Sequence, residues 1–470
     1  MYDFEAGKLR TAPDKKPIDL GLVYTCLLVA TEMRGLALCL QTVTFTTLYS
    51  DELRLVQPEN FGASSRYHVS IVAEIANDEM MDEIKRRHGD TNLYQYMSHL
   101  HNYEEGSCFG VCWCIKPSDN NGDCPSVYRE TIRISGSRTQ HPVSPRYLPS
   151  DAPWKTPTEK ELDRLAKYFM GVKWKSSKNS LHHEWHGKFW NPEPGKYRFS
   201  AAASAIHFLK SISSQVRQHI RNIVLCEDHP AVASPACHIR GFIPFCHENP
   251  SLLIKRRVSL WRNIFLWQNW SNSRAPKLHW WKTTTAVENR GLPVTYPSRP
   301  VAEWMAEAAR SDIPDAATLV FDGDTIPEHS ATIFRDVIHC GSAMQQVADR
   351  MWNLDDPDED PDMVYKIKFS SKAWQCKGFP DLLKDMCDDH NNSNNNKIKK
   401  CPHIRCNFDP GQPWDENRIT KDILEACDGS THRFNWFWSR DEVVDTVAPL
   451  PSYYQSWKEN LLPEGEQDWT

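Results

Sequence analysis

The sequence lacks the short motifs from which an enzyme reaction can be identified. It contains no glycine-rich phosphate loop of the Walker type and no GxSxG turn that would present a nucleophilic serine. It also lacks an excess of positive charge, because 55 lysines and arginines are outnumbered by 61 aspartates and glutamates, a formal net charge of -6. The charge balance argues against a protein whose main partner is the phosphate backbone of nucleic acid.

A long uninterrupted apolar segment is also missing. Residues 1–21 contain no apolar core of the kind that a signal peptide needs. The most apolar window, residues 20–40, carries Glu32 and Arg34 near its middle. Each would cost about 2.5–3.5 kcal/mol at the centre of a bilayer. We therefore expect a soluble chain without a membrane partner, in which this window is a buried helix.

Cysteine is abundant, but its distribution does not favour disulfides. The fifteen cysteines are an odd number, and Cys26, Cys39 and Cys226 lie inside apolar runs. Free cysteine packs there as a small hydrophobic residue. We expect reduced thiols and an intracellular protein, cytoplasmic or nuclear.

A helix followed by a strand is the arrangement that recurs along the chain. Apolar positions three and four apart, followed by β-branched runs, predict it for residues 20–49, 200–225 and 301–321. Ser200 is placed to cap the middle helix, and Pro300 to begin the last one. We predict a mixed α/β or α+β protein: helices packed on partly parallel strands in an irregular stack like that of leucine-rich repeats, with several long loops.

The length of 470 residues exceeds one usual hydrophobic core, so several lobes are expected. Five prolines between residues 142 and 157 indicate a linker. We expect five regions: an N-terminal arm (1–18), a first helix-strand lobe (19–140), the linker (141–157), a central helix-strand lobe (158–370) and a loop-rich C-terminal region (371–470).

Two groups of residues could carry an enzyme site, and each has a simpler structural reading. Asp322 and Asp324 in FDGD could hold a divalent metal and a diphosphate at a strand end, but a turn requires the same residues. Cys237 and His247 could form a nucleophile and its base, provided the fold brings them together, because adjacent cysteine and histidine on a strand point apart.

Two further groups contain metal-ligand residue types. Cys401, His403 and Cys406 offer thiolates and an imidazole, but the CxxxxC spacing is not that of a zinc site. His182 and His186 are four residues apart without the glutamate placement of a metalloprotease. We expect no cofactor, no bound metal and no catalytic residue.

Several segments resemble a group of filamentous-fungal F-box-like proteins to which no reaction is assigned. The stretch IDLGLVYTCLLVATEMRGLALCLQTVTF (18–45) resembles their early part through Cys26, Glu32 and a strand that ends at Phe45. Their later part is similar to FSAAASAIHFL (199–209), IRNIVLCED (220–228), CHIRGFIPFCHENP (237–250), RRVSLW (256–261) and HRFNWFWSR (432–440). The F-box-like motif that opens those proteins is not found before Ile18, so we expect no ubiquitin-ligase scaffold as a partner.

We therefore expect a non-enzymatic scaffold for protein-protein interaction, like the recognition part of F-box-like proteins. Such a scaffold should expose an apolar or aromatic patch, which some of the eighteen tryptophans could supply. One alternative is an enzyme with a site near Asp322 and Asp324 or near Cys237 and His247. The other alternative is a truncated product without a selected function.

Overall fold

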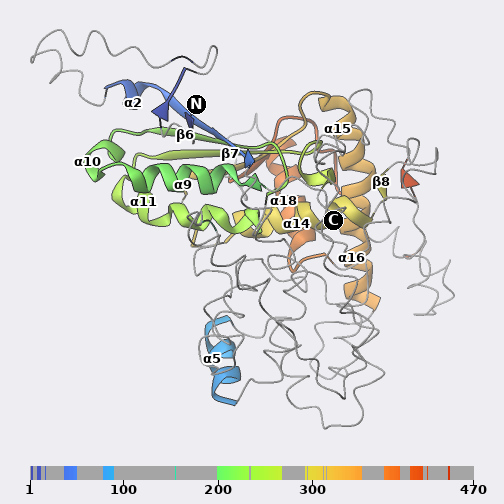
Figure 1. The fold of residues 1–470 in the computed structure, drawn as a ribbon. Coiled ribbons are helices and arrows are strands. Elements are labelled where there is room, and N and C mark those ends of the chain that lie inside the picture. The colour runs from blue at the N-terminus through green and yellow to red at the C-terminus, as the bar shows by residue number, and fades with distance from the viewer. Residues whose placement is uncertain are drawn as a thin grey trace, which may run out of the picture.

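The central feature of the computed structural model is a parallel β-sheet with helices beside it (Figure 1). The structure describes residues 2–3, 8–11, 16, 36–49, 78–88, 154, 198–231, 234–266, 292–293, 295–310, 312–313, 315–351, 375–391, 403–415, 421 and 443–444.

The strands of this five-stranded sheet lie side by side in the order in which they occur in the sequence, and every neighbouring pair is parallel. They are β3 (Thr42–Thr46), β6 (Asn222–Glu227), β7 (Leu253–Ser259), β9 (Ala317–Asp322) and β10 (Ile404–Cys406). Parallel neighbours need crossover connections, which are almost always right-handed. When such crossovers advance steadily in one direction, they place their helices on the same face of the sheet.

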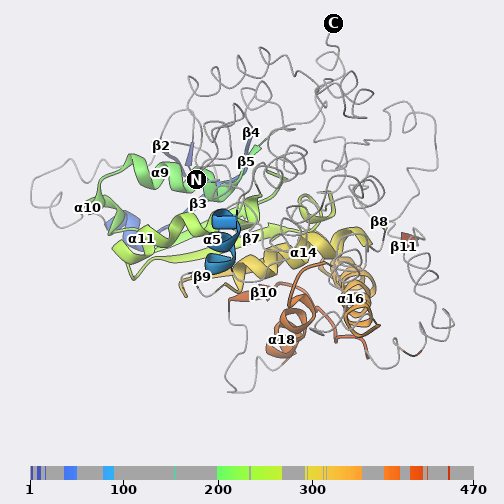
Figure 2. The same cartoon turned by 90° about the horizontal axis from the view of Figure 1, so that it is seen from below.

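The helices follow this rule: α9, α11 and α14 lie on one side of the sheet in Figures 1 and 2. The helices and helical turns between the strands are α9 (Ala201–Ser211), α10 (Ser214–Arg217), η4 (Pro235–Phe242), α11 (Ile243–Glu248), η5 (Ile264–Leu266), α14 (Thr295–Ala308), α15 (Pro327–Ile333), the π-helix η6 (Phe334–Ile338), α16 (His339–Met351) and α18 (Phe379–Asn391).

Alternate residues of each strand face these helices, because side chains alternate along a strand. The pairing register aligns them in rows across the sheet. One row is Val43, Ile223, Ile254 and Ala317, and the next is Phe45, Leu225, Arg256, Leu319 and Ile404; all are buried. This face of the sheet is therefore apolar except for Arg256 and, in the next row, Glu227.

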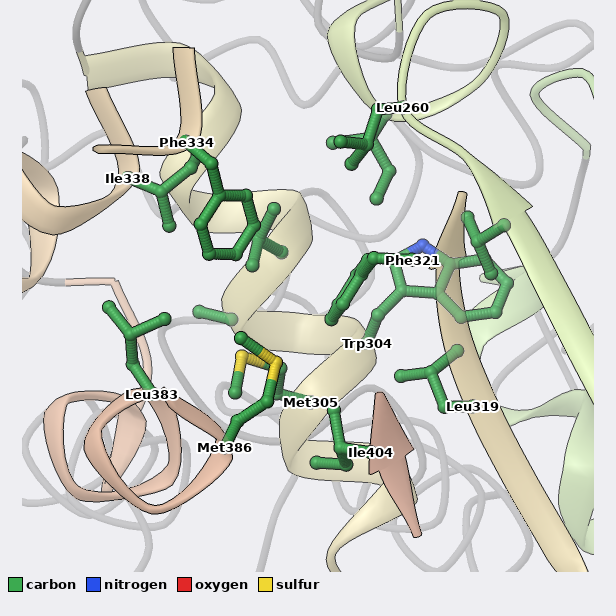
Figure 3. Packing of buried hydrophobic residues seen from close by; sticks show 14 of the residues in the cluster. Leu260, Trp304, Met305, Leu319, Phe321, Phe334, Ile338, Leu383, Met386 and Ile404 are labelled. Atoms are coloured by element: carbon green, nitrogen blue, oxygen red, sulfur yellow. The ribbon is translucent and has the colours of Figure 1, made fainter. Parts of the chain in front are cut away.

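The core has two parts under this face. One part joins β3 and β6 to α9 and η4. The other joins β9 and β10 to α14, η6 and α18 (Figure 3). Phe321 and Phe334 mark its centre, where their ring centroids lie 6.3 Å apart and both side chains are fully buried.

The remaining elements are short. They are β1 (Tyr2–Asp3) paired with β2 (Lys8–Leu9), α2 (Leu36–Leu40), β4 (Leu48–Tyr49) paired with β5 (Arg198–Phe199), α5 (Asp78–His88), and β8 (Leu292–Pro293) paired with β11 (Val443–Val444). Within the described ranges, no helix has the length and apolar character needed to cross a membrane.

The structure confirms the mixed class of helices with a parallel sheet. Ser200 is the N-cap of α9, where its hydroxyl accepts a hydrogen bond from the backbone N–H of Ala203. The sheet takes β3 from the expected first lobe, β6, β7 and β9 from the central lobe, and β10 from the C-terminal region. The linker lies outside the described residues, apart from Trp154.

Two features differ from the expectations. The helix expected to begin after Pro300 begins at Thr295 and contains that proline, whose ring removes a backbone hydrogen bond. Pro297, Ser298 and Pro300 are all buried at this end of the helix. Residues 237–238 and 246–247, considered as strand positions, lie on the helices η4 and α11.

Candidate functional site

The face of the sheet opposite the helices is the candidate site. Its outward strand positions are mostly half-buried or exposed, whereas the inward positions, apart from the half-buried Cys406, are buried. The outward residues are Thr42, Thr44, Thr46, Asn222, Val224, Cys226, Leu253, Lys255, Arg257, Ser259, Thr318, Val320, Asp322 and Arg405. We call this set the open face.

The cations of the open face differ in how they are paired. Lys255 and Arg405 are exposed, and neither forms an ion pair with another described residue. Arg257 is half-buried and donates to Asp322 at 2.6 Å and to Asp324 at 3.2 Å. The open face therefore carries charge that its own chain satisfies only in part.

Asp322 and Asp324 lie where β9 ends and the chain turns. The backbone N–H of Asp324 donates to Asp322, as expected of a turn built on an aspartate. Asp322 also accepts a hydrogen bond from Asn407 at 2.7 Å. The structure thus brings the two carboxylates together, but around the Arg257 guanidinium, which occupies the position that a metal ion would need.

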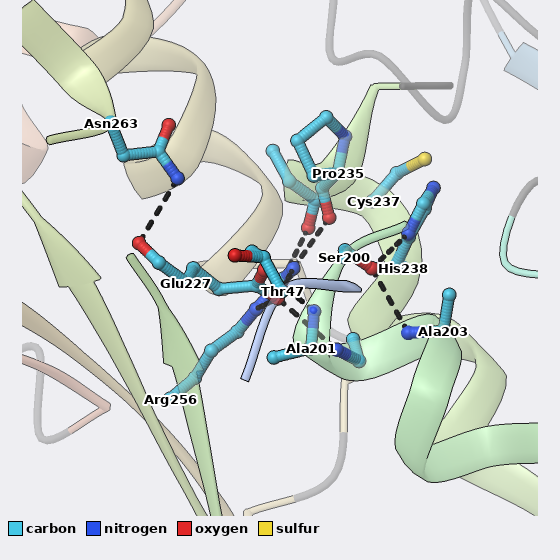
Figure 4. A network of polar contacts seen from close by, with 12 residues as sticks. Thr47, Ser200, Ala201, Ala203, Glu227, Pro235, Cys237, His238, Arg256 and Asn263 are labelled. Carbon is cyan, nitrogen blue, oxygen red and sulfur yellow. Dashed lines mark hydrogen bonds and ion pairs between the residues drawn. The ribbon is translucent and has the colours of Figure 1, made fainter. Parts of the chain in front are cut away.

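A second polar cluster lies on the helix-covered side of the sheet and is fully buried (Figure 4). Glu227, at the end of β6, accepts hydrogen bonds from the backbone N–H groups of Ala201 and Ala202 at the start of α9. Arg256 donates to the Glu227 carboxylate at 2.7 and 3.1 Å, and to the carbonyls of Pro235 and Ala236. The carboxylate is also favoured by the positive end of the helix dipole.

The guanidinium of Arg256 also contacts an aromatic ring. Its guanidinium carbon lies 4.2 Å from the ring centroid of Trp304, within the range of a cation–π contact. A crevice of about 20 Å³ beside these two residues has an almost wholly apolar lining and is close to the size of one water molecule. The cluster therefore joins β6, β7, α9, η4 and α14, and its groups are satisfied by one another.

His238 has a partner that the sequence does not indicate. Its Nδ1 lies 2.6 Å from the hydroxyl of Ser200, and both residues are almost completely buried. A serine beside a histidine can act as a nucleophile, but that chemistry needs access for a substrate. Here the Ser200 hydroxyl also caps α9. The pair fixes the start of the helix.

Cys237 and His247 do not form a catalytic arrangement. Cys237 is buried in η4, where its thiol donates to the carbonyl of Ser234. His247 is exposed on α11. The two residues lie in different environments, one in the core and one at the surface.

The two described members of the candidate metal group, His403 and Cys406, each contact a residue from outside that group. Cys406 Sγ lies 3.6 Å from His390 Nδ1, whereas His403 faces Asp315 at 3.7 Å. Burial raises the pKa of both Cys387 and Cys406 to about 12, so these thiols stay protonated at neutral pH. Cys401, His182 and His186 lie outside the described residues, within which no three potential ligands meet.

Among the tryptophans, Trp261 does not supply an exposed patch. It is half-buried, stacks on His329 with centroids 5.5 Å apart, and donates from its indole nitrogen to Ser330. Trp267 and the tryptophans that follow it as far as residue 281 lie outside the described ranges.

These features define a parallel α/β protein with one helix-covered sheet face and one polar sheet face. Comparison with known proteins gives no match to a protein-family model, to a curated protein or to a solved structure.

Proposed function

We propose that this protein is a non-enzymatic scaffold that binds another protein through the open face of its sheet. The observation that carries the proposal is the contrast in burial between the two faces. The inward strand side chains are buried under α9, η4, α14 and α18, whereas Thr42, Leu253, Lys255 and Arg405 stay exposed.

The finer architecture belongs to the same proposal. An irregular stack of leucine-rich-repeat type is supported by parallel strands that follow one another in sequence order with helices on one side. Stacks of this kind bind partners with an extended sheet surface. The resemblance to the recognition part of F-box-like proteins agrees with this role but adds no activity.

An enzymatic role receives less support. The ionisable groups closest to an active-site arrangement are either buried, as in Ser200 and His238, or engaged with Arg257, as in Asp322 and Asp324. Converging ionisable groups in an accessible cleft are what an active site requires.

Site-specific photo-cross-linking in the native cell tests the proposal. A photoreactive residue is placed at Thr42 or Thr318 on the open face, and at Lys210 or Lys384 on the exposed helix surfaces as matched controls. We expect the open-face positions to give a reproducible cross-linked protein that the helix positions do not give. No cross-linked protein, or the same proteins from both surfaces, would contradict the proposal.

A further inference from the structure

The charges of the open face indicate the chemistry of its partner. We propose that the open face binds an extended acidic segment of another protein, which lies along β7 with its carboxylates on Lys255 and Arg257. This inference rests on the proposed function, because it names what the scaffold would bind.

The open face carries positive charge although the whole chain is negative. Lys255, Arg257 and Arg405 project from it, against the single carboxylate of Asp322, in a chain of formal net charge -6. That carboxylate already accepts hydrogen bonds from Arg257 and Asn407. An acidic ligand would therefore meet two cations without an ion pair to another described residue, Lys255 and Arg405, and at Arg257 it would share the guanidinium with Asp322 and Asp324.

The outward residues of β7 form a line with a two-residue period. Leu253, Lys255 and Arg257 are successive outward positions, and Leu253 keeps 57% of its surface exposed. Positions two apart on a strand are separated by about 7 Å. An extended ligand has the same period. A ligand with an apolar residue, and with acidic residues two and four positions after it, would therefore match Leu253, Lys255 and Arg257 in turn.

Arg405 extends the positive region sideways. It stands in the same row as Arg257, with Val320 of β9 between them. Two strand spacings place their backbones about 10 Å apart. A further carboxylate of the same segment, or of its neighbouring residues, would be attracted by this exposed guanidinium, which presents a bidentate donor pair.

Nucleic acid fits this surface less well than an acidic peptide. Single-stranded nucleic acid is held by aromatic side chains on which bases stack, and the outward strand positions include no aromatic residue. The overall negative charge would also repel a polyphosphate. An exposed leucine beside the cations favours a protein ligand with both acidic and apolar side chains.

Fluorescence anisotropy with the full chain tests the inference. The probe is a short labelled peptide of serine and glycine that contains one leucine followed by glutamates at alternate positions. Its controls are the same peptide with glutamine for glutamate and a labelled oligothymidine. We expect the glutamate peptide to bind at least about fivefold more tightly than the glutamine peptide, a difference that shrinks as salt is added.

Matched variants locate the binding. The double variant Lys255→Gln, Arg405→Gln should weaken binding of the glutamate peptide about fivefold, since exposed charge pairs each contribute modestly. Lys210→Gln, Lys384→Gln removes the same charge from exposed helix positions and should change it less than about twofold. The charge-preserving variant Lys255→Arg, Arg405→Lys should bind like the parent chain.

Three results would overturn the inference: no binding of the glutamate peptide, equal weakening by both glutamine variants, or tighter binding of the oligothymidine. The scaffold proposal fails separately, when the open-face cross-linkers capture no specific protein. If they capture one but the glutamate peptide does not bind, the scaffold stands and its acidic specificity is wrong.

Discussion

Neighbouring residues of the same type lie in different environments on the two faces of the sheet, and Arg256 and Arg257 show this most clearly. Arg256 is 3% exposed, donates to Glu227 and to two carbonyls, and lies over Trp304. Arg257, one position later, faces outward and donates to the carboxylates of Asp322 and Asp324. The strand period alone decides which arginine is structural.

The physical reason is the environment on each side. A buried charge needs partners for its full hydrogen-bonding capacity, because an unpaired one costs several kcal/mol. An outward charge can be hydrated and does not depend on a protein partner, so the exposed Lys255 and Arg405 stay available to a ligand. The helix-covered face is therefore where stability should respond to mutation, and the open face is where binding should respond.

The largest expected effect comes from the buried ion pair. Arg256→Met leaves the Glu227 carboxylate buried without its cation, and should lower the free energy of unfolding by about 3–5 kcal/mol. Arg257→Met removes the same group from the outward face and should cost less than about 1 kcal/mol. Urea denaturation of both variants measures the difference.

Equal losses in these two variants would remove the contrast between the faces. A second variant separates loss of the pair from loss of packing. Glu227→Gln with Arg256→Met removes both charges together, and should recover part of the stability lost by Arg256→Met alone. No recovery would mean that the arginine acts mainly through its contacts with Trp304 and the carbonyls.

Local rules were sufficient for much of this fold. Ser200 precedes an alanine-rich stretch with helical spacing, and it is the cap of α9. The run Lys255-Arg256-Arg257 lies in β7, where strand alternation places Arg256 on one face and its neighbours on the other.

Other features depend on distant partners or on weak local patterns. Nothing near Arg256 indicates Glu227, because the pair forms only when β6 and β7 align. Cys406 belongs to β10, a strand of only three residues. The pairing of β10 with β9 determines the position of this cysteine. The sequence does not predict the helix α18, although Leu383, Met386 and Cys387 have helical spacing, because acidic residues surround them.

A smaller effect is expected at the start of α9. Ser200→Ala removes the cap of the helix and leaves His238 without its hydroxyl partner in the core, which should cost about 1–3 kcal/mol. Ser213 is at the corresponding position of α10 but makes no capping hydrogen bond, so Ser213→Ala should cost less than about 0.5 kcal/mol. Thermal unfolding compares the stability of the two variants. Similar losses of stability would mean that the Ser200 hydroxyl does not stabilise the start of α9.

The next effect depends on pH. Burial raises the pKa of Cys387 from 9 to about 12, so above pH 9 the unfolded chain loses a proton that the folded chain keeps. Stability should therefore fall as pH rises, by about 1 kcal/mol from pH 9 to 10 for this thiol. On the open face, burial also raises the pKa of Cys226, but the Arg257 guanidinium counters it. Cys387→Ala should flatten the pH dependence of urea unfolding more than Cys226→Ala, and the reverse order would contradict the burial assignment.

The smallest effect should come from the outward threonines. Thr44→Val replaces a half-buried hydroxyl on the open face by a methyl group of the same shape, and should change the free energy of unfolding by less than about 0.5 kcal/mol. Val43→Thr makes the reverse change one position earlier, where the side chain is 4% exposed, and a buried hydroxyl without a partner costs about 1–3 kcal/mol. Urea unfolding of the two variants tests the alternation at single-residue spacing. A costly Thr44→Val change would mean that the open face is tightly packed, and it would then be a core surface instead of a binding surface.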